Sequence, residues 1–262
     1  MLRKRYAASV PKDPAAPEQN EDSFGCDEAR QLFVLSDGAS ESFNSRLWAR
    51  VLVGVGLEVR PGSPRAHCQF LRHCINVYED RCREGVRTWA EEAAYARGSF
   101  ATYLAVRGAR APEEAIVLGT GDSLAVLAAD GELVSSFPYT TAEQFAERPH
   151  LLSTRPALNR LGGIDVVEAL RSLCREDPGG ALHRRWNLGE FHGARILCMT
   201  DALGAWLLRG EQDGEPRLRR LLELETEEDL RELVEEERRH RRMRRDDTTL
   251  LVLGWNDAAA DA

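Results

Sequence analysis

Residues 32–38 read Leu32-Phe33-Val34-Leu35-Ser36-Asp37-Gly38, an apolar run that ends in an aspartate and a glycine. Four adjacent apolar residues followed by an Asp-Gly turn signal predict a buried strand whose end carries Asp37. A second apolar run, Ile196–Met199, is followed by Thr200 and Asp201. A third starts with Asp246-Asp247-Thr248-Thr249 and continues through Leu253. The fold is therefore expected to rest on strands that carry aspartates at their ends.

These three aspartates are expected to converge in the folded chain. Two follow their strands and Asp246 precedes its strand, so antiparallel pairing would bring all three to the same end of a sheet. A fourth, Asp122, lies in the turn Gly119-Thr120-Gly121-Asp122-Ser123 between two further apolar runs. Clustered carboxylates repel one another, and a cation would hold them together. Hard divalent metals such as magnesium and manganese prefer oxygen ligands of this kind.

Each aspartate has a simpler explanation when it is taken alone, because aspartate is common in turns and caps. Their order and strand context favour a shared site for Asp37, Asp201 and Asp246. For Asp122, a Gly-Asp-Ser hairpin turn is an adequate alternative.

The composition is that of an ordinary globular protein. The chain has 262 residues, 43% of them hydrophobic, and a formal net charge of -8. An acidic balance argues against a general nucleic-acid or membrane-surface binder. No apolar run approaches the roughly 20 residues that span a bilayer, and no signal-like apolar core follows the basic residues 1–5. We expect one domain over residues 1–262, located in the cytoplasm, with no nucleic acid or membrane as partner.

Cysteine spacing gives little support to a zinc site. None of the six cysteines forms a CxxC pair. We expect reduced, buried thiols, with Cys74 and Cys82 on the apolar face of a helix and Cys198 inside a strand.

Periodicity places the remaining elements. Helices are predicted over residues 45–59 and 65–95, the second with an apolar stripe from Leu71 to Trp89. A third helix is expected near 165–175, a fourth from about 203, and a fifth after the capping-box-like Thr226-Glu227-Glu228-Asp229. Consecutive antiparallel strands are predicted at 100–106, 115–118, 124–128 and 132–137.

Turn signals and the order of the elements indicate the fold class. Asp130-Gly131 is a hairpin signal between two of the strands. Residues 138–163 read as a long irregular segment, which is often functional and could form a substrate-facing flap. The last strand is expected over 248–253. Two groups of strands with helices before and between them indicate an α+β sandwich.

Five short motifs follow one another along almost the whole chain. They are Asn20-Glu21-Asp22-Ser23-Phe24, Ser36-Asp37-Gly38, Gly121-Asp122-Ser123, Thr200-Asp201 and Asp246-Asp247-Thr248-Thr249. In order and spacing they resemble the motifs of the type 2C, metal-dependent protein phosphatase family, and in particular its divergent bacterial members.

The resemblance implies two stacked antiparallel β-sheets flanked by α-helices, with a dinuclear Mg²⁺ or Mn²⁺ site at one end. Asp37 would bridge the two ions, and the Gly38 carbonyl would complete one of them. Asp201 and Asp246 would hold the other ion.

The same resemblance assigns three further acidic residues. Asp122, together with Asp201, would bind a weaker third ion. Glu21 and Asp22 would act directly or through bound waters. A structural role for Glu21 and Asp22, as caps of a strand, remains open.

The resemblance also implies a reaction. A water shared by two metal ions has a lowered pKa and can attack phosphorus, with Asp37, Asp201 and Asp246 as the residues on which catalysis depends. No nucleophilic side chain is required, and the chain has no GxSxG, HExxH or P-loop motif. The expected substrate is phosphoserine or phosphothreonine in a protein, and a cognate serine/threonine kinase would be a partner.

Two other functions remain open. The chain could be a catalytically weak or inactive phosphatase-like module that binds a phosphoprotein or partner as a regulator. It could also hydrolyse a small phosphorylated metabolite.

Position 17 departs from the family pattern. The family usually carries an arginine three residues before the asparagine of the first motif, where it grips the substrate phosphate. Here the residue is Pro17, which carries no charge and donates no hydrogen bond. We expect weaker phosphate binding, or a substitute cation from Arg3, Lys4, Arg5 or Lys12.

Two other charged features lie close to the motifs. Glu41 adds a negative charge near Asp37 that could coordinate metal, repel phosphate or face solvent. The basic run 238–245 could be a solvated helix end or an electropositive wall that attracts phosphorylated substrate. We favour the helix end, because acidic residues 235–237 lie one turn away.

Overall fold

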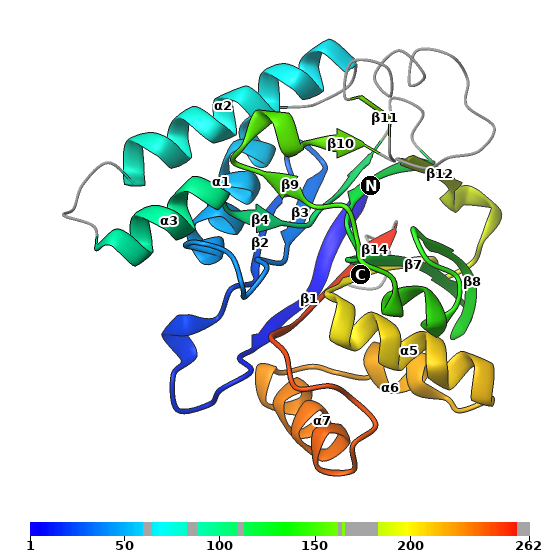
Figure 1. Cartoon of the computed structure of the whole chain (residues 1–262). Helices are drawn as coiled ribbons and strands as arrows, with labels where there is room; N and C mark the ends of the chain where they lie inside the picture. The colour runs from blue at the N-terminus through cyan, green and yellow to red at the C-terminus, as the bar shows by residue number, and fades with distance from the viewer. Residues whose placement is uncertain (60–63, 83–87, 109–112, 162–163, 166–182, 256–262) are drawn as a thin grey trace.

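Ten of the described strands form two five-stranded antiparallel sheets (Figure 1). The computed structural model describes residues 1–59, 64–82, 88–108, 113–161, 164–165 and 183–255, and for residues 64–68, 160–161 and 164–165 only the backbone. The first sheet has the order β1 (Leu2–Val10), β14 (Thr248–Trp255), β13 (Arg195–Met199), β7 (Leu124–Ala129) and β8 (Glu132–Phe137). The second has the order β12 (His183–Asn187), β6 (Glu114–Thr120), β5 (Tyr103–Gly108), β3 (Leu32–Ser36) and β2 (Ser23–Asp27).

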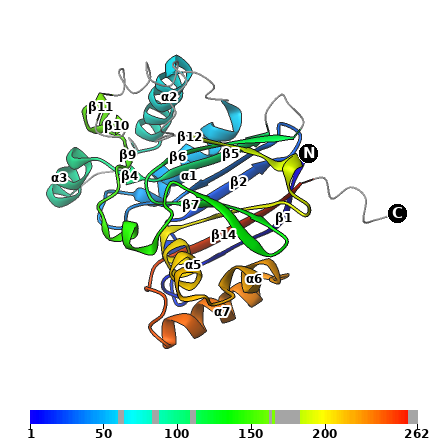
Figure 2. The same ribbon diagram turned by 90° about the vertical axis from the view of Figure 1, so that its right-hand side faces the viewer.

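Helices cover the outer face of each sheet (Figures 1 and 2). The second sheet packs against α1 (Ser45–Glu58) and α2 (Pro64–Cys82), which α3 (Trp89–Arg97) follows in the chain. The first sheet packs against α5 (Asp201–Asp213), α6 (Arg217–Leu222) and α7 (Glu227–Arg239). The expected α+β sandwich is confirmed.

Shorter elements complete the described part of the chain. Two pairs of two-residue strands are β4 (Phe100–Ala101) with β9 (Leu152–Ser153) and β10 (Arg160–Leu161) with β11 (Ile164–Asp165). The 3-10 turns are η1 (Pro17–Gln19), η2 (Ala142–Ala146), η3 (Pro156–Leu158) and η4 (Leu188–Glu190).

Strand alternation explains why the apolar run at residues 32–35 is buried on both faces. Phe33 and Leu35 belong to the core between the sheets, whereas Leu32 and Val34 belong to the core beneath α1 and α2. Successive side chains of a strand point to opposite faces, so a strand covered on both sides needs an unbroken apolar sequence.

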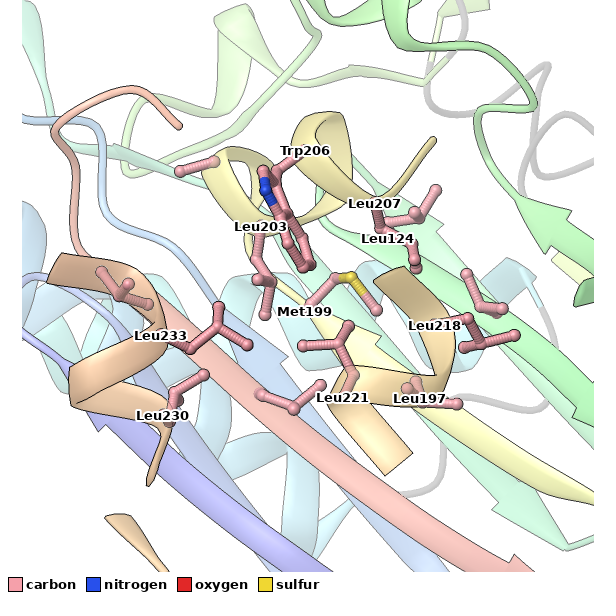
Figure 3. Packing of buried hydrophobic residues seen from close by; sticks show 14 of the residues in the cluster. Leu124, Leu197, Met199, Leu203, Trp206, Leu207, Leu218, Leu221, Leu230 and Leu233 are labelled. Carbon is pink, nitrogen blue, oxygen red and sulfur yellow. The ribbon is translucent and has the colours of Figure 1, made fainter. Parts of the chain in front are cut away.

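The outer core of the first sheet contains Trp206 of α5 (Figure 3). Its side chain lies beside Leu203 and Met199 in this view, and the same cluster includes Leu221 of α6 and Leu230 of α7. The indole Nε1 donates a hydrogen bond to Glu237 at 2.9 Å, so its polar atom is satisfied inside the core. This core anchors α5, whose first residue is Asp201.

The predicted helix over 65–95 was wrong as one continuous element. A new helix, α3, begins after Thr88, which has extended backbone angles and forms a capping box with Glu91. Trp89 is 87% exposed instead of continuing the apolar stripe. A capping residue stops a helix even where the apolar spacing would permit it to continue, and Val86 lies outside the described residues.

The prediction of consecutive antiparallel strands was partly wrong. β5 pairs with β6, and β7 pairs with β8 through the expected Asp130-Gly131 hairpin. β6 and β7 do not pair, because they belong to different sheets. The turn around Asp122 is therefore a crossing between sheets, and the hairpin alternative for Asp122 was wrong.

Other boundaries moved by a few residues or were missed. The predicted capping box at Thr226 begins α7, and α5 starts at Asp201, two residues earlier than expected. β1 was not predicted, because its sequence begins with basic residues on an edge strand. The helix expected at 165–175 falls outside the described residues, apart from Asp165 in β11.

Two other expectations can be compared with the described part of the chain. Cys74, Cys82 and Cys198 are buried free thiols. No helix in the described ranges has the length and apolar character needed to cross a membrane.

Candidate active site

Four predicted aspartates line one cavity of about 210 Å³. Asp37 follows β3 of the second sheet, and Asp201 and Asp246 flank β13 and β14 of the first. Asp122 lies in the crossing between β6 and β7. The expectation that antiparallel pairing within a single sheet joins these residues was wrong, because both sheets contribute to the cavity. The convergence depends on how the sheets stack.

Thr102 holds the loop that carries Asp37. Its Oγ1 accepts a hydrogen bond from the Asp37 amide at 2.8 Å and shares another with Ser123 Oγ at 2.7 Å. Its own amide donates to the Asp37 carbonyl at 2.8 Å. Thr102 therefore connects the Asp37 loop to the segment that contains Asp122.

Two glycines permit close backbone approach in these loops. A Cβ on Gly38 would lie 2.9 Å from the Ser45 backbone and 3.0 Å from the Glu21 carbonyl oxygen. Gly121 has φ +99°, and a Cβ there would lie 2.7 Å from Thr102 Cγ2. Glycine is the residue that tolerates both constraints, which explains the Asp-Gly and Gly-Asp pairs.

Asp22 is hydrogen-bonded to threonines that are close in the chain to Asp201 and Asp246. Its Oδ2 accepts hydrogen bonds from Thr249 Oγ1 at 2.7 Å and Thr200 Oγ1 at 3.1 Å. Its Oδ1 is inaccessible to solvent and has no partner among the described residues. Burial raises the pKa of Asp22 to about 7, and the negative charges of Asp247 and Asp246 add to this effect.

Glu21 is directed toward a cluster of donors beside the cavity. Lys12 Nζ lies 2.5 Å from its Oε2, and the hydroxyls of Ser40 and Ser45 also donate to it. Burial acts to raise the pKa of Glu21, but these hydrogen bonds outweigh it and lower the pKa. Glu21 does not line the cavity itself.

Asp247, which belongs to the fifth motif but had no predicted role, connects the Glu21 segment to the first sheet. It is buried and accepts hydrogen bonds from the Lys12 amide at 2.6 Å and the Glu21 amide at 2.8 Å. Its position directly after Asp246 was the available signal.

Burial raises the pKa of both Asp37 and Asp122. Neighbouring carboxylates raise the pKa further, with Asp22 and Asp122 acting on Asp37 and Asp246 acting on Asp122. The positive charge of Arg244 acts in the opposite direction on both groups. The cavity thus concentrates negative charge beyond what one cation compensates.

Arg244 is the positively charged residue that lines this cavity. It belongs to the basic run 238–245, for which a helix end was favoured over an electropositive wall. Its guanidinium forms an ion pair with Asp201 and lies 3.3 Å from Asp246 Oδ2. Its place two residues before Asp246 was the available signal. The basic run therefore has two parts, since Arg238 and Arg239 end α7 as expected while Arg244 reaches the cavity.

The other charged candidates lie elsewhere. Arg3 and Lys4 pair with the far end of β14, away from the cavity, and Arg5 lies at the irregularity that follows them. Pro17 is an exposed residue of η1. Of the four suggested substitutes, Lys12 alone lies beside the cavity residues, through Ser40 at 2.8 Å. Glu41 is exposed and does not line the cavity. From the irregular segment 138–163, Pro149 and Leu151 do line it.

The donor set fits hard divalent ions in kind. The cavity offers carboxylates from both sheets, and Oδ1 of Asp201 is a buried atom without a hydrogen-bond partner among the described residues. As the side chains are placed, no three acidic, histidine or cysteine residues of the described part lie close enough to hold one ion. Arg244 occupies the space between Asp201 and Asp246.

Known structures share this architecture. The photosystem II phosphatase PBCP matches with a TM-score of 0.60 and 15% identity, covering 97% of this chain and 98% of its own. The catalytic domain of the serine/threonine protein phosphatase PstP, solved with two manganese ions, matches with a TM-score of 0.57 and 18% identity, covering 97% of each chain.

The chain has the type 2C phosphatase fold. PppA of Pseudomonas aeruginosa, described as a regulatory component of T6SS, matches with a TM-score of 0.51 and 20% identity over 96% of each chain. No protein-family model and no curated protein matches the sequence. The type 2C resemblance inferred from five short motifs is thus confirmed at the level of the fold.

Proposed function

We propose that the chain is a magnesium- or manganese-dependent phosphatase that acts on phosphoserine and phosphothreonine in proteins. The observation that carries this proposal is the convergence of Asp37, Asp122, Asp201 and Asp246 on one cavity of a type 2C fold. The solved structures that share the fold include protein phosphatases, one of them with two manganese ions.

The proposed roles follow the positions around the cavity. Asp37 and the carbonyl of Gly38 would serve the ion nearer the second sheet. Asp201 and Asp246 would serve the ion nearer the first sheet, and Asp122 a weaker third ion. When bound, two such ions supply a water of lowered pKa and neutralise phosphoryl charge.

The chain's own groups would orient these carboxylates. Thr102 fixes the Asp37 loop, and Thr249 and Thr200 fix Asp22. Glu21, held by Lys12 and two serines, would act through bound water, because it does not line the cavity. Such supporting partners typically change metal affinity or activity by about 10–100-fold.

The proposal is tested by phosphate release from a phosphopeptide panel, with and without added Mn²⁺ or Mg²⁺. Wild-type protein should hydrolyse phosphopeptides only with metal. Asp37→Asn and Asp201→Asn should reduce turnover by more than about 100-fold, since they remove ligands and not only supporting partners. Small phosphate esters in the same assay distinguish a metabolite phosphatase. Unchanged turnover in either variant contradicts the assignment.

A regulatory module without turnover is the second candidate. The observations that favour it are Pro17 in place of the usual arginine and the ion pair of Arg244 with Asp201. Steady hydrolysis with excess metal would eliminate it. Binding of a phosphoprotein without hydrolysis, by a chain that folds normally, would favour it over the enzyme. Under either function we propose that the partner is a phosphorylated protein, which a serine/threonine kinase would phosphorylate.

A further inference from the structure

The loop between α7 and β14 places one guanidinium in the cavity. Arg244 lines the cavity together with the four aspartates, and its side chain is 47% exposed. It is therefore held by carboxylates on one side and open to solvent on the other. Among the described residues that line the cavity, it is the one with a positive charge.

Neighbouring cations are engaged in other contacts. Arg238 donates to the carbonyls of Pro11 and Asp246 and to Thr248 Oγ1. Arg245 donates from Nε to the Lys12 carbonyl at 2.9 Å and is 69% exposed. These contacts hold the loop and direct its neighbours away, so that Arg244 alone of these three reaches the cavity.

Lys12 is a weaker candidate for gripping a substrate. Its ammonium lies 2.5 Å from Glu21 and 2.8 Å from Ser40 Oγ, so two of its three donors are already used. An ammonium also acts as a point charge, whereas a guanidinium can donate two parallel hydrogen bonds to a phosphoryl group.

Charge balance points the same way. Two divalent ions carry as much positive charge as the four cavity carboxylates carry negative charge. A phosphoserine or phosphothreonine brings about −1.5 to −2 further charges. A cation beyond these two ions would help to offset that charge, and Pro17 cannot supply it.

We propose that Arg244 binds the phosphoryl group of the substrate, in the role that Pro17 leaves unfilled. The identity of the substrate rests on the proposed function, whereas the phosphate contact can be measured separately. The ion pairs with Asp201 and Asp246 keep the guanidinium in the cavity. If metal ions engaged these two carboxylates, the guanidinium donors would be free to bond the phosphoryl oxygens.

The direct test is calorimetric binding of inorganic phosphate to the full chain in the presence of Mn²⁺. Arg244→Gln should weaken phosphate binding about 10–100-fold, the range for a hydrogen bond to a charged group. Arg244→Lys should fall between wild type and Arg244→Gln, because it keeps the charge and loses the paired donors. Arg245→Gln is the matched control, with the same charge change one residue away, and should bind phosphate as wild type does.

The kinetic test separates substrate binding from chemistry. Arg244→Gln should raise KM for a phosphopeptide by a similar factor, with a smaller change in kcat. Phosphate binding that is unchanged in Arg244→Gln overturns the inference. Equal losses in Arg244→Gln and Arg245→Gln overturn it as well, since they would reflect overall charge.

Two further outcomes are informative. If Arg244→Gln binds Mn²⁺ more tightly and phosphate as before, Arg244 is only a counterion and the inference fails. If phosphate binding depends on Arg244 but wild-type protein hydrolyses no phosphopeptide, the inference stands and the proposed function fails. Thermal unfolding of each variant confirms that the protein compared is folded.

Discussion

The Thr102 hydroxyl lies 2.8 Å from the Asp37 amide nitrogen, whose hydrogen bond it accepts. The same oxygen is 2.7 Å from Ser123 Oγ, so one buried side chain joins two loops that carry cavity aspartates. Backbone hydrogen bonds from the Thr102 amide to the Asp37 carbonyl and from the Ala39 amide to the Phe100 carbonyl also hold the Asp37 loop. The Thr102 hydroxyl adds a contact that reaches both loops and so helps to set the position of Asp37 relative to Asp122.

Replacing Thr102 by valine, which has nearly the same shape, should disturb the site through that hydroxyl. Thr102→Val leaves the Asp37 amide without its acceptor, at a cost of about 1–3 kcal/mol in the free energy of unfolding. Phosphopeptide turnover should fall about 10–100-fold, as for other groups that support a ligand. Urea denaturation and steady-state kinetics measure the two effects.

Thr102→Ser is the matched control, because it keeps the hydroxyl and removes a methyl group. It should restore most of the turnover. Similar kinetics in the serine and valine variants would show that the hydroxyl does not position Asp37.

Gly38 should not tolerate a side chain. In Gly38→Ala the new Cβ meets the Ser45 backbone at 2.9 Å, and backbone cannot move aside as a flexible side chain does. We expect a loss of about 1–3 kcal/mol in the free energy of unfolding, as for other overpacked sites. Gly54→Ala is the control, since it lies on the exposed face of α1 with nothing within 4 Å of its Cβ.

The control should be more stable than wild type by about 0.5–1 kcal/mol, because alanine favours a helix interior over glycine. Thermal denaturation of both variants tests whether Gly38→Ala lowers the stability and Gly54→Ala raises it. Equal stability of Gly38→Ala and wild type would mean that the loop can relax away from α1.

Asp37 and Arg244 show how much of the site could be predicted from the sequence. The pattern at 32–38 was enough to predict the strand and its Asp-Gly end, because burial on both faces demands an unbroken apolar run. It could not assign Asp37 to a different sheet from Asp201 and Asp246, because pairing between distant strands leaves no local signal. Arg244 could not be singled out within the basic run 238–245 for a similar reason. The arginines of the run are chemically identical, and the fold decides which of them points into the cavity.

Glu237 should make stability depend on pH. Its side chain is 1% exposed and accepts hydrogen bonds from Arg242, Trp206 and Arg220. These donors lower its pKa to about 2, from an ordinary value of 4.5. The contribution of ionised Glu237 to the free energy of unfolding is thus complete above pH 4.5 and is lost as the pH falls from there toward 2.

Glu237→Gln removes this contribution and should lower the free energy of unfolding by about 1–3 kcal/mol at neutral pH. The difference in the free energy of unfolding between variant and wild type should become smaller as the pH falls from 4.5 to 2. Urea midpoints measured across that range test the sign. Glu236→Gln, at a half-exposed position with one ion pair to Arg220 at 3.1 Å, should show a much smaller gap at every pH.

Metal should stabilise the fold if the proposed ligands bind it. Ligand at 100 times its Kd stabilises a folded protein by about 2.7 kcal/mol, so Mn²⁺ should raise the Tm of wild type, and chelation with EDTA should reverse the shift. Asp201→Asn should lose most of this shift.

The matched control is Asp130→Asn, an identical change in the exposed β7–β8 hairpin at the other end of β7. It should retain the full shift with Mn²⁺. A shift of equal size in wild type and Asp201→Asn would place the bound ion elsewhere.

The crossing from β6 to β7 has a mechanical consequence. Because it carries Asp122 from one sheet to the other, any shear between the sheets changes the spacing of the cavity carboxylates. An ion bound by residues of both sheets would hold the two sheets together. Its affinity would therefore depend on the relative position of the sheets, and its binding would in turn stabilise that position. Side chains in the core between the sheets, far from any substrate, would then influence metal affinity, because they set the relative position of the two sheets.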